Sequence, residues 1–256
     1  MTGRFQSILI TGASSGIGAA LAEAYAAPGV SLFLCGRDPA RLEKTREICL
    51  AGGAARVEVQ ALDVTDRRAM EEWVTRTDSD HPLDLVIANA GVSGDTSGGE
   101  GAPERDRLVR EVKVNGVLNT IDPLVPRMAA RGRGQIAVMS SLASFRGMPG
   151  ALHYAAANAW ARSYGEGLRG RLAADGIGVS VICPGWVVSR ITDENRFHMP
   201  LLMDAPKAAR IIQRGIARNR PRIAFPWIFH AMLVLIAALP PGLTDRFFAG
   251  LPRKQD

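Results

Sequence analysis

Three polar residues in the second half of the chain can together move a proton. Ser141 and Tyr154 carry hydroxyl groups, and Asn158 follows Tyr154 by four positions, so the last two share one face of a helix. A carbonyl that is being reduced develops negative charge on its oxygen and must receive a proton there. The Ser141 hydroxyl can hydrogen-bond that oxygen while Tyr154 donates the proton. These residue types therefore indicate chemistry on a carbonyl or an alcohol.

The elements that must position these residues alternate between strand-like and helix-like segments. Apolar runs predict strands over residues 7–10, 31–35, 56–62, 83–88, 135–139, 178–183 and 222–225. Helical spacing covers residues 16–27, 40–50, 66–77, 103–131, 151–174 and 205–218. This alternation predicts an α/β fold, a Rossmann-type doubly wound parallel sheet in a single domain. Residues 1–222 would form the cofactor and catalytic domain, and residues 223–256 an apolar helical extension of that domain.

A glycine-rich turn follows the first predicted strand. Residues 11–18 read Thr-Gly-Ala-Ser-Ser-Gly-Ile-Gly and open the first predicted helix. Glycine is needed where the backbone turns tightly and where a pyrophosphate must approach main-chain N–H groups. In this context the turn predicts a nucleotide site, at the carboxyl ends of the strands.

The order of the motifs resembles the short-chain dehydrogenase/reductase family, from Ser7 to about Ser189. The resemblance implies a nicotinamide cofactor and a carbonyl/alcohol reaction. The matching motifs are the turn at residues 11–18, Asp63, Asn89-Ala90-Gly91, Val114-Asn115-Gly116, Ser141 with Tyr154 thirteen positions later, and Pro184-Gly185. The cofactor-binding residues that the resemblance implies are Gly12, Ser14, Ser15, Gly16, Ile17, Gly18, Arg37, Asp63, Val64, Asn89, Ala90, Gly91, Tyr154, Asn158, Pro184, Gly185 and Val187.

The same resemblance implies a catalytic set in which one residue departs from the family pattern. Ser141 would polarise the substrate oxygen, Tyr154 would pass the proton and Asn115 would hold a relay water. The family has a lysine four positions after the tyrosine, where this chain has Asn158. An asparagine can hydrogen-bond the cofactor ribose but offers no positive charge. No lysine has an evident route to this place; the four are Lys44, Lys113, Lys207 and Lys254.

The missing charge leaves three interpretations open. The first is an active enzyme that tolerates asparagine, with the charge of the oxidised nicotinamide helping Tyr154. The second is an enzyme that mainly carries out reduction, because a tyrosine with its ordinary pKa of about 10 is already a proton donor. The third is a catalytically impaired nucleotide-binding sensor or scaffold of the same fold, which cofactor binding without turnover of carbonyl compounds would indicate.

The end of the second predicted strand favours NADP over NAD. An acidic residue there would accept hydrogen bonds from the ribose and repel a 2′-phosphate, whereas an arginine would pair with that phosphate. The chain has Cys35-Gly36-Arg37, with no acid at the strand end. Asp38 comes one position later and is expected to cap the next helix.

Composition limits the partners that we expect. The net charge of +6 is assigned to a solvated surface beside a phosphate-bearing cofactor and not to nucleic acid, because no arginine run has interleaved aromatics. The three cysteines show neither metal-binding nor disulfide spacing, so we expect no metal and a reducing cytoplasm. The N-terminal residues lead directly into a strand-like run, which predicts no signal peptide.

An apolar run over residues 223–239 comes late in the chain. Pro226 interrupts it, so the expected helix over residues 227–239 is too short to span a bilayer. It would cover the substrate pocket or an oligomer interface; the alternative is peripheral contact with a membrane. The family resemblance implies a homodimer or homotetramer. The substrate is not specified by any of these patterns.

Overall fold

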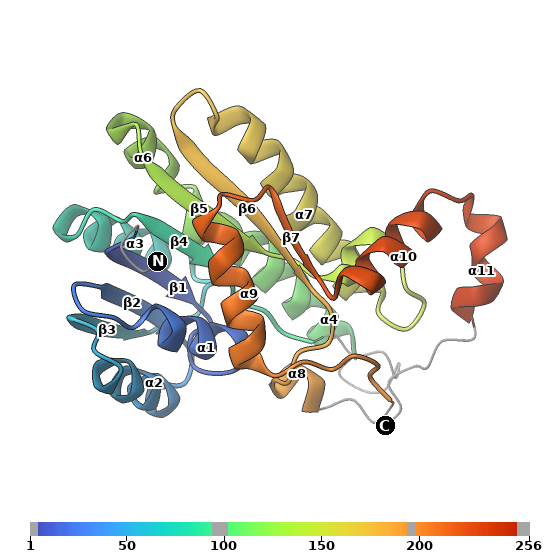
Figure 1. Cartoon of the computed structure of the whole chain (residues 1–256), viewed down its shortest axis with the longest axis horizontal. Coiled ribbons are helices and arrows are strands. Elements are labelled where there is room, and N and C mark those ends of the chain that lie inside the picture. Colours follow the sequence, from blue (N-terminus) through green and yellow to red (C-terminus); the bar gives the residue numbers. More distant parts are fainter. Residues whose placement is uncertain (1–4, 94–101, 194–197, 250–256) are drawn as a thin grey trace.

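A computed structural model describes residues 5–93, 102–193 and 198–249 of the chain. Seven parallel strands form one sheet in the order β3-β2-β1-β4-β5-β6-β7 (Figure 1). The strands are β1 (Ser7–Thr11), β2 (Ser31–Gly36), β3 (Arg56–Ala61), β4 (Leu85–Ala88), β5 (Gly134–Met139), β6 (Ile177–Pro184) and β7 (Arg222–Phe225). The order reverses between β1 and β4, so the predicted doubly wound α/β fold is confirmed.

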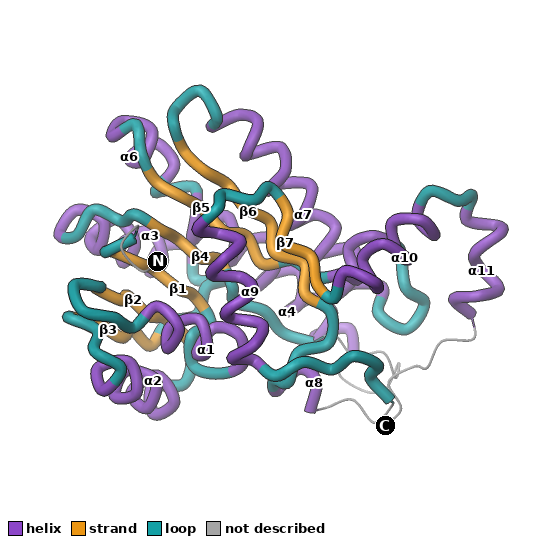
Figure 2. Tube along the Cα trace, in the orientation of Figure 1, coloured by secondary structure: helices purple, strands orange, loops and turns teal. Residues whose placement is uncertain are grey.

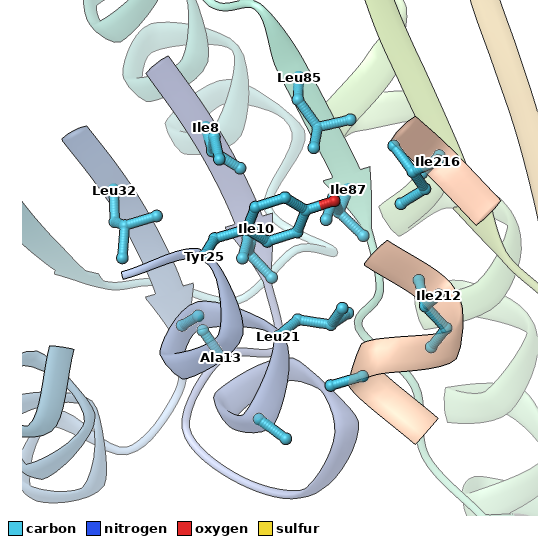
Figure 3. Close-up of a cluster of buried hydrophobic side chains, with 14 of the residues drawn as sticks. Ile8, Ile10, Ala13, Leu21, Tyr25, Leu32, Leu85, Ile87, Ile212 and Ile216 are labelled. Carbon is cyan, nitrogen blue, oxygen red and sulfur yellow. The ribbon is translucent and has the colours of Figure 1, made fainter. Parts of the chain in front are cut away.

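Helices cover both faces of the sheet (Figure 2), which explains why the strand sequences are apolar on both sides. One face packs against α1 (Gly16–Tyr25), α2 (Pro39–Ala51) and α9 (Ala205–Ala217). The opposite face packs against α3 (Arg67–Asp80), α5 (Gly116–Ile121) and α7 (Leu152–Leu172). Figure 3 shows Leu21 and Tyr25 of α1 beside Ile10 and Ile87 of the sheet, with Ile212 of α9 closing the cluster. These two cores hold the carboxyl ends of the strands in fixed positions.

The prediction of one long helix over residues 103–131, bent at Pro123 and Pro126, was wrong. The segment is divided into α4 (Ala102–Arg110), a π-helical turn η1 (Glu111–Asn115), α5, and α6 (Val125–Arg131). Pro126 occupies the first turn of α6, where its missing N–H costs nothing. The π-helical turn inserts an extra residue into the helical repeat and so changes which side chains face the sheet.

A buried ionic cluster joins α3 to α6. The Asp78 side chain is fully buried and accepts hydrogen bonds from Arg127 at 2.6 Å and from Arg131 at 2.7 and 2.8 Å. Burial raises the pKa of Asp78, but the hydrogen bonds from Arg131, the Leu83 amide and Arg127 outweigh that effect and hold it below the usual value. Both arginines keep part of their surface in water, which limits the desolvation cost of the cluster.

The chain after β7 forms α10 (Trp227–Ala237) and α11 (Pro241–Ala249), which extend away from the sheet in Figure 1. The helix expected over residues 227–239 thus ends two residues early, and α11 was not expected. On the inner side of α10, Phe229 and Leu233 pack near Leu142 and Cys183. Its outer side leaves Trp227 73% and Leu235 68% exposed. Within the described residues, no helix is long and apolar enough to cross a membrane.

The segment between α8 (Arg190–Asp193) and α9 is only partly described, because residues 194–197 lie outside the described residues. Met203 forms an isolated parallel bridge with Val187. The described part of this segment is therefore joined to the chain that follows β6.

Candidate active site

The glycine-rich turn after β1 has a backbone that only glycine fits. Gly12 and Gly16 have φ angles of 69° and 55°, in the left-handed region. A Cβ on Gly18 would lie 2.2 Å from the Gly12 carbonyl oxygen and 2.6 Å from the Asn89 amide nitrogen. The turn therefore packs backbone against backbone, as a close approach to a phosphate requires.

The first turn of α1 is free to receive an anion. Ser15 is the N-cap residue, but its side chain makes no capping hydrogen bond, and the first turn contains no acidic residue. The N–H groups at a helix N-terminus have no partners within the helix, and the helix dipole favours negative charge there. With the glycine backbone beside it, this end of α1 has the features of a pyrophosphate site.

Hydrogen bonds fix the turn after β4 against the turn after β1. The Thr11 hydroxyl accepts from the backbone N–H groups of Asn89 at 3.1 Å and Ala90 at 3.2 Å. The Asn89 amide donates to the Thr11 carbonyl at 2.9 Å and to the Gly12 carbonyl at 3.3 Å. The Asn89 side chain therefore stabilises the packing of the two turns, and its amide N–H groups already donate to backbone carbonyls. A Cβ on Gly16 would lie 3.0 Å from Cβ of Ser189, so the chain after β6 borders the same turn.

The residues expected near the adenosine end lie at the ends of β2 and β3. Arg37 is 55% exposed, and its guanidinium lies 4.0 Å from the Asp63 carboxylate. Asp63 also accepts from the Thr65 backbone at 2.9 Å. Asp38 caps α2 by accepting from the Arg41 backbone, as the sequence predicted. Arg37 is thus held at the strand end by one long ion pair and is free to turn toward a phosphate.

Val64 and Ser14 mark the two sides of this end of the site. Val64 is buried, and a Cβ on Gly116 of α5 would lie 2.6 Å from its Cγ2. A Cβ on Gly36 would lie 3.2 Å from the Ser14 hydroxyl oxygen. The close packing of the β2 and β3 ends on α5 and the glycine turn gives this end of the site its shape.

The two serines after β5 have different roles. The Ser140 hydroxyl donates to the main-chain carbonyl of Asn158 at 2.8 Å and so ties β5 to α7. Ser141 caps the short 3₁₀ helix η2 (Leu142–Phe145), and its hydroxyl accepts from the Ala143 backbone at 3.1 Å. It also lies 3.5 Å from the carbonyl of Pro184, at the end of β6. Of the two hydroxyls, Ser141 is the one directed toward Tyr154.

Tyr154 is a neutral phenol in this structure. Burial raises its pKa, and hydrogen bonding to the side chains of Ser141 and Asn158 only partly opposes that rise. Ser141, Tyr154 and Asn158 are therefore together, as the sequence predicted. A partly buried phenol with a raised pKa holds a proton that it can give to an oxygen gaining negative charge.

Asn158 is fully buried, and only the nitrogen of its side-chain amide makes a hydrogen bond. Its Nδ2 donates to the carbonyl of Tyr154 at 2.9 Å, one turn earlier in α7. Its Oδ1 is buried and has no hydrogen-bond partner among the described residues. A buried amide oxygen without a partner costs free energy, so a donor from outside the protein chain would be favourable there.

The structure does not bring Asn115 to the site, and that prediction needs correction. Asn115 is exposed, and its amide donates to the Glu111 carboxylate on the outer face of the helix. Lys113, two residues earlier, is buried, and its ammonium donates to the Met139 carbonyl at 2.9 Å. The expectation that no lysine reaches this region is therefore wrong. The regular helical period gave no signal for Lys113, because the residue lies in the π-helical turn η1.

Burial lowers the pKa of Lys113 to about 8, with a small opposing effect from the Cys183 thiol. Burial also raises the pKa of Cys183 to about 11, so the thiol is neutral at physiological pH. At neutral pH the ammonium is therefore charged, and its charge is not compensated by a carboxylate ion pair in the described part of the chain.

The comparisons with known proteins agree with this geometry. A family model described as short chain dehydrogenase matches residues 6–199. The chain belongs to the short-chain dehydrogenase family. An uncharacterized oxidoreductase of Myxococcus xanthus is 38% identical to it over 242 residues, which are 94% of this chain and 95% of the relative.

Solved structures show the short-chain dehydrogenase fold over most of the chain. A short-chain dehydrogenase from Sphingobium yanoikuyae in complex with NADPH has a TM-score of 0.80 at 24% identity, covering 98% of both chains. One from Mycobacterium paratuberculosis bound to NAD has a TM-score of 0.73 at 22% identity, covering 86% of this chain and 94% of that one. At these identities the likeness concerns the fold alone.

Proposed function

We propose that the protein is an NADP(H)-dependent oxidoreductase that interconverts a carbonyl and an alcohol and favours reduction. The observation that carries the proposal is the partly buried Tyr154 phenol, with its raised pKa, beside Ser141 at the end of the sheet where the glycine turn lies. The protein is an oxidoreductase of the short-chain dehydrogenase type by family, and this pair defines where the substrate oxygen would sit.

The residues present fit a nicotinamide dinucleotide. The pyrophosphate would lie on Gly12, Gly16 and the uncapped N-terminus of α1, where a Cβ would fill the space. Pro184 and Gly185 would border the nicotinamide, and Asn158 would offer its unpartnered Oδ1 to a ribose hydroxyl. When bound, the cofactor supplies the hydride. The chain itself orients the substrate oxygen through Ser141 and moves the proton through Tyr154.

Arg37 supports NADP over NAD. The chain carries no acidic residue at the end of β2, where a carboxylate would repel a 2′-phosphate. The guanidinium of Arg37 is held by Asp63 only at 4.0 Å and is more than half exposed. A phosphate could therefore recruit it without breaking a close hydrogen bond, and the gain would be a charge-assisted pair.

The raised pKa of Tyr154 supports reduction as the favoured direction. In the reductive direction the phenol must give a proton, and it holds that proton throughout the neutral range. In the oxidative direction it must first lose the proton, which burial opposes. Asn158 offers no positive charge to offset that cost, unlike the lysine that the family pattern places four residues after the tyrosine.

A carbonyl panel assayed with NADPH and with NADH tests this function. We expect NADPH oxidation with at least one ketone or aldehyde, and loss of that rate in Tyr154→Phe. Tyr164→Phe is the matched control, because that phenol also lies on α7 but bonds to Asp122 outside the site. Tight NADPH binding with no turnover across the panel would instead support the nucleotide-binding sensor or scaffold, which the uncharged Asn158 keeps as the second candidate.

We also propose that the protein is a homodimer or homotetramer, with the outer face of α10 in contact with a second copy. This face exposes Trp227, Ile228 and Leu235, and α10 contains neither lysine nor arginine. A helix that lies on a membrane surface carries basic residues on its polar side, so the composition of α10 favours a protein partner over a membrane. An exposed apolar patch of this kind is typical of an interface.

A further inference from the structure

Lys113 lies between the turn after β4 and the end of β5. Its ammonium donates to the carbonyl of Met139, the last residue of β5, at 2.9 Å. A Cβ on Gly91 would lie 3.3 Å from both its Cε and its Nζ, so the side chain also touches the turn after β4. The buried side chain thus reaches from η1 to the ends of two neighbouring strands, β4 and β5.

Short links join this ammonium to the proton-donating residues. The Met139 carbonyl that it contacts belongs to the peptide leading into Ser140, whose hydroxyl bonds to the Asn158 main chain. Ser141, the next residue, hydrogen-bonds to Tyr154. The Met139 residue that accepts this hydrogen bond is therefore two positions along the chain from Ser141, the serine that contacts the phenol.

The ammonium has capacity to bind something more. It carries three N–H donors and makes one hydrogen bond within the described residues. Asn158 of α7, also buried, has an acceptor without a partner among the described residues. Two spare donors and one spare acceptor in a dry site are unfavourable unless a polar ligand completes them.

We propose that Lys113 supplies the positive charge of this active site. In the family pattern that charge comes from a lysine on α7, at the position that Asn158 occupies here. This inference rests on the proposed function. The ammonium would donate to the cofactor ribose. The Asn158 amide would accept from the same ribose and keep the phenol oriented.

The titratable groups around the ammonium allow a pH test. Strands β4 and β5 contribute none, α7 contributes Tyr154 and β6 contributes Cys183, with Arg162 and Arg222 beyond that thiol. Burial raises the pKa of both Tyr154 and Cys183. Of Lys113, Tyr154 and Cys183, Lys113 is therefore the first to lose a proton as the pH rises, with a pKa of about 8.

The experiment measures the NADPH dissociation constant by fluorescence titration from pH 6.5 to 9.5. In the unmodified protein we expect NADPH binding to weaken as the pH rises through about 8, where the ammonium loses its proton. Lys113→Asn should weaken binding about tenfold to hundredfold at neutral pH, the value of a hydrogen bond from a charged donor, and remove the pH step. The exchange variant Lys113→Asn with Asn158→Lys should restore both. Lys44→Asn, an exposed lysine on α2, is the matched control and should change neither.

The exchange variant separates an electrostatic role from a structural one. If Lys113 only braced the Met139 carbonyl, a lysine at position 158 would not restore binding or its pH step, and that result would overturn the proposal. An unchanged NADPH affinity in Lys113→Asn would do the same. If Lys113→Asn does not fold, the NADPH affinity and pH profile of the exchange variant test the proposal, because that variant keeps one lysine and one asparagine. Absence of turnover in the unmodified protein would count against the proposed reaction, while the binding profile would still test Lys113.

Discussion

Replacing Gly18 by alanine tests the cofactor turn most sharply. The new methyl group would lie 2.2 Å from the Gly12 carbonyl oxygen and 2.8 Å from the Gly12 carbonyl carbon, and both atoms belong to the backbone. Neither can rotate away, so α1 must shift relative to the turn. Overpacking costs about 1–3 kcal/mol, and a backbone clash lies in the upper part of that range. We expect the melting temperature to fall by roughly 4–12 °C.

The same shift should displace the N-terminus of α1, so NADPH affinity should fall at least about tenfold. Gly167→Ala is the control, because that helical glycine on α7 is exposed and a Cβ there meets nothing within 4 Å. It should stabilise the protein by about 0.5–1 kcal/mol and leave binding unchanged. Differential scanning calorimetry and NADPH titration measure both effects. A Gly18→Ala protein that melts and binds NADPH like the original would refute this account of the turn.

Three further predictions follow from the described contacts. Arg37→Asp should lower the preference for NADPH over NADH by about tenfold to hundredfold in equilibrium titrations, because a carboxylate repels the 2′-phosphate; an unchanged ratio would place the phosphate elsewhere. Asp78→Ala should lower the free energy of unfolding by about 3 kcal/mol, measured in urea, because two arginines lose their buried partner. Since the folded pKa of Asp78 is held below its unfolded value, this contribution should be complete above about pH 4 and disappear as the pH falls through the folded pKa; a loss on the alkaline side would contradict it. Leu235→Ser should dissociate the oligomer in sedimentation experiments without changing the melting of the monomer, and an unchanged sedimentation coefficient would exclude the outer face of α10 as the interface.

Sequence patterns predicted the sheet because most strands are short apolar runs, while β3 alternates polar and apolar residues. They also brought Ser141, Tyr154 and Asn158 together, since the four-residue spacing on α7 fixes the relation of the last two. These features depend on local periodicity and on the order of elements, which the sequence carries directly.

The prediction of one helix over residues 103–131 was wrong for a physical reason. A π-helical turn places one extra residue in the repeat, and the packing of α5 on the sheet determines where that turn occurs. The regular 3.6-residue period could not show that Lys113 faces inward while Asn115 faces water. The motif around Asn115 matched the family pattern, and the match concealed the lysine two positions earlier.

Transfer of deuterium from 4-deuterated NADPH to a ketone tests the central claim most directly. The account predicts deuterium on the carbinol carbon of the alcohol product, detected by mass spectrometry, in the unmodified protein and in Tyr164→Phe. It predicts no labelled product in Tyr154→Phe, although that variant should still bind NADPH. Labelled alcohol at an undiminished rate in Tyr154→Phe would contradict the account.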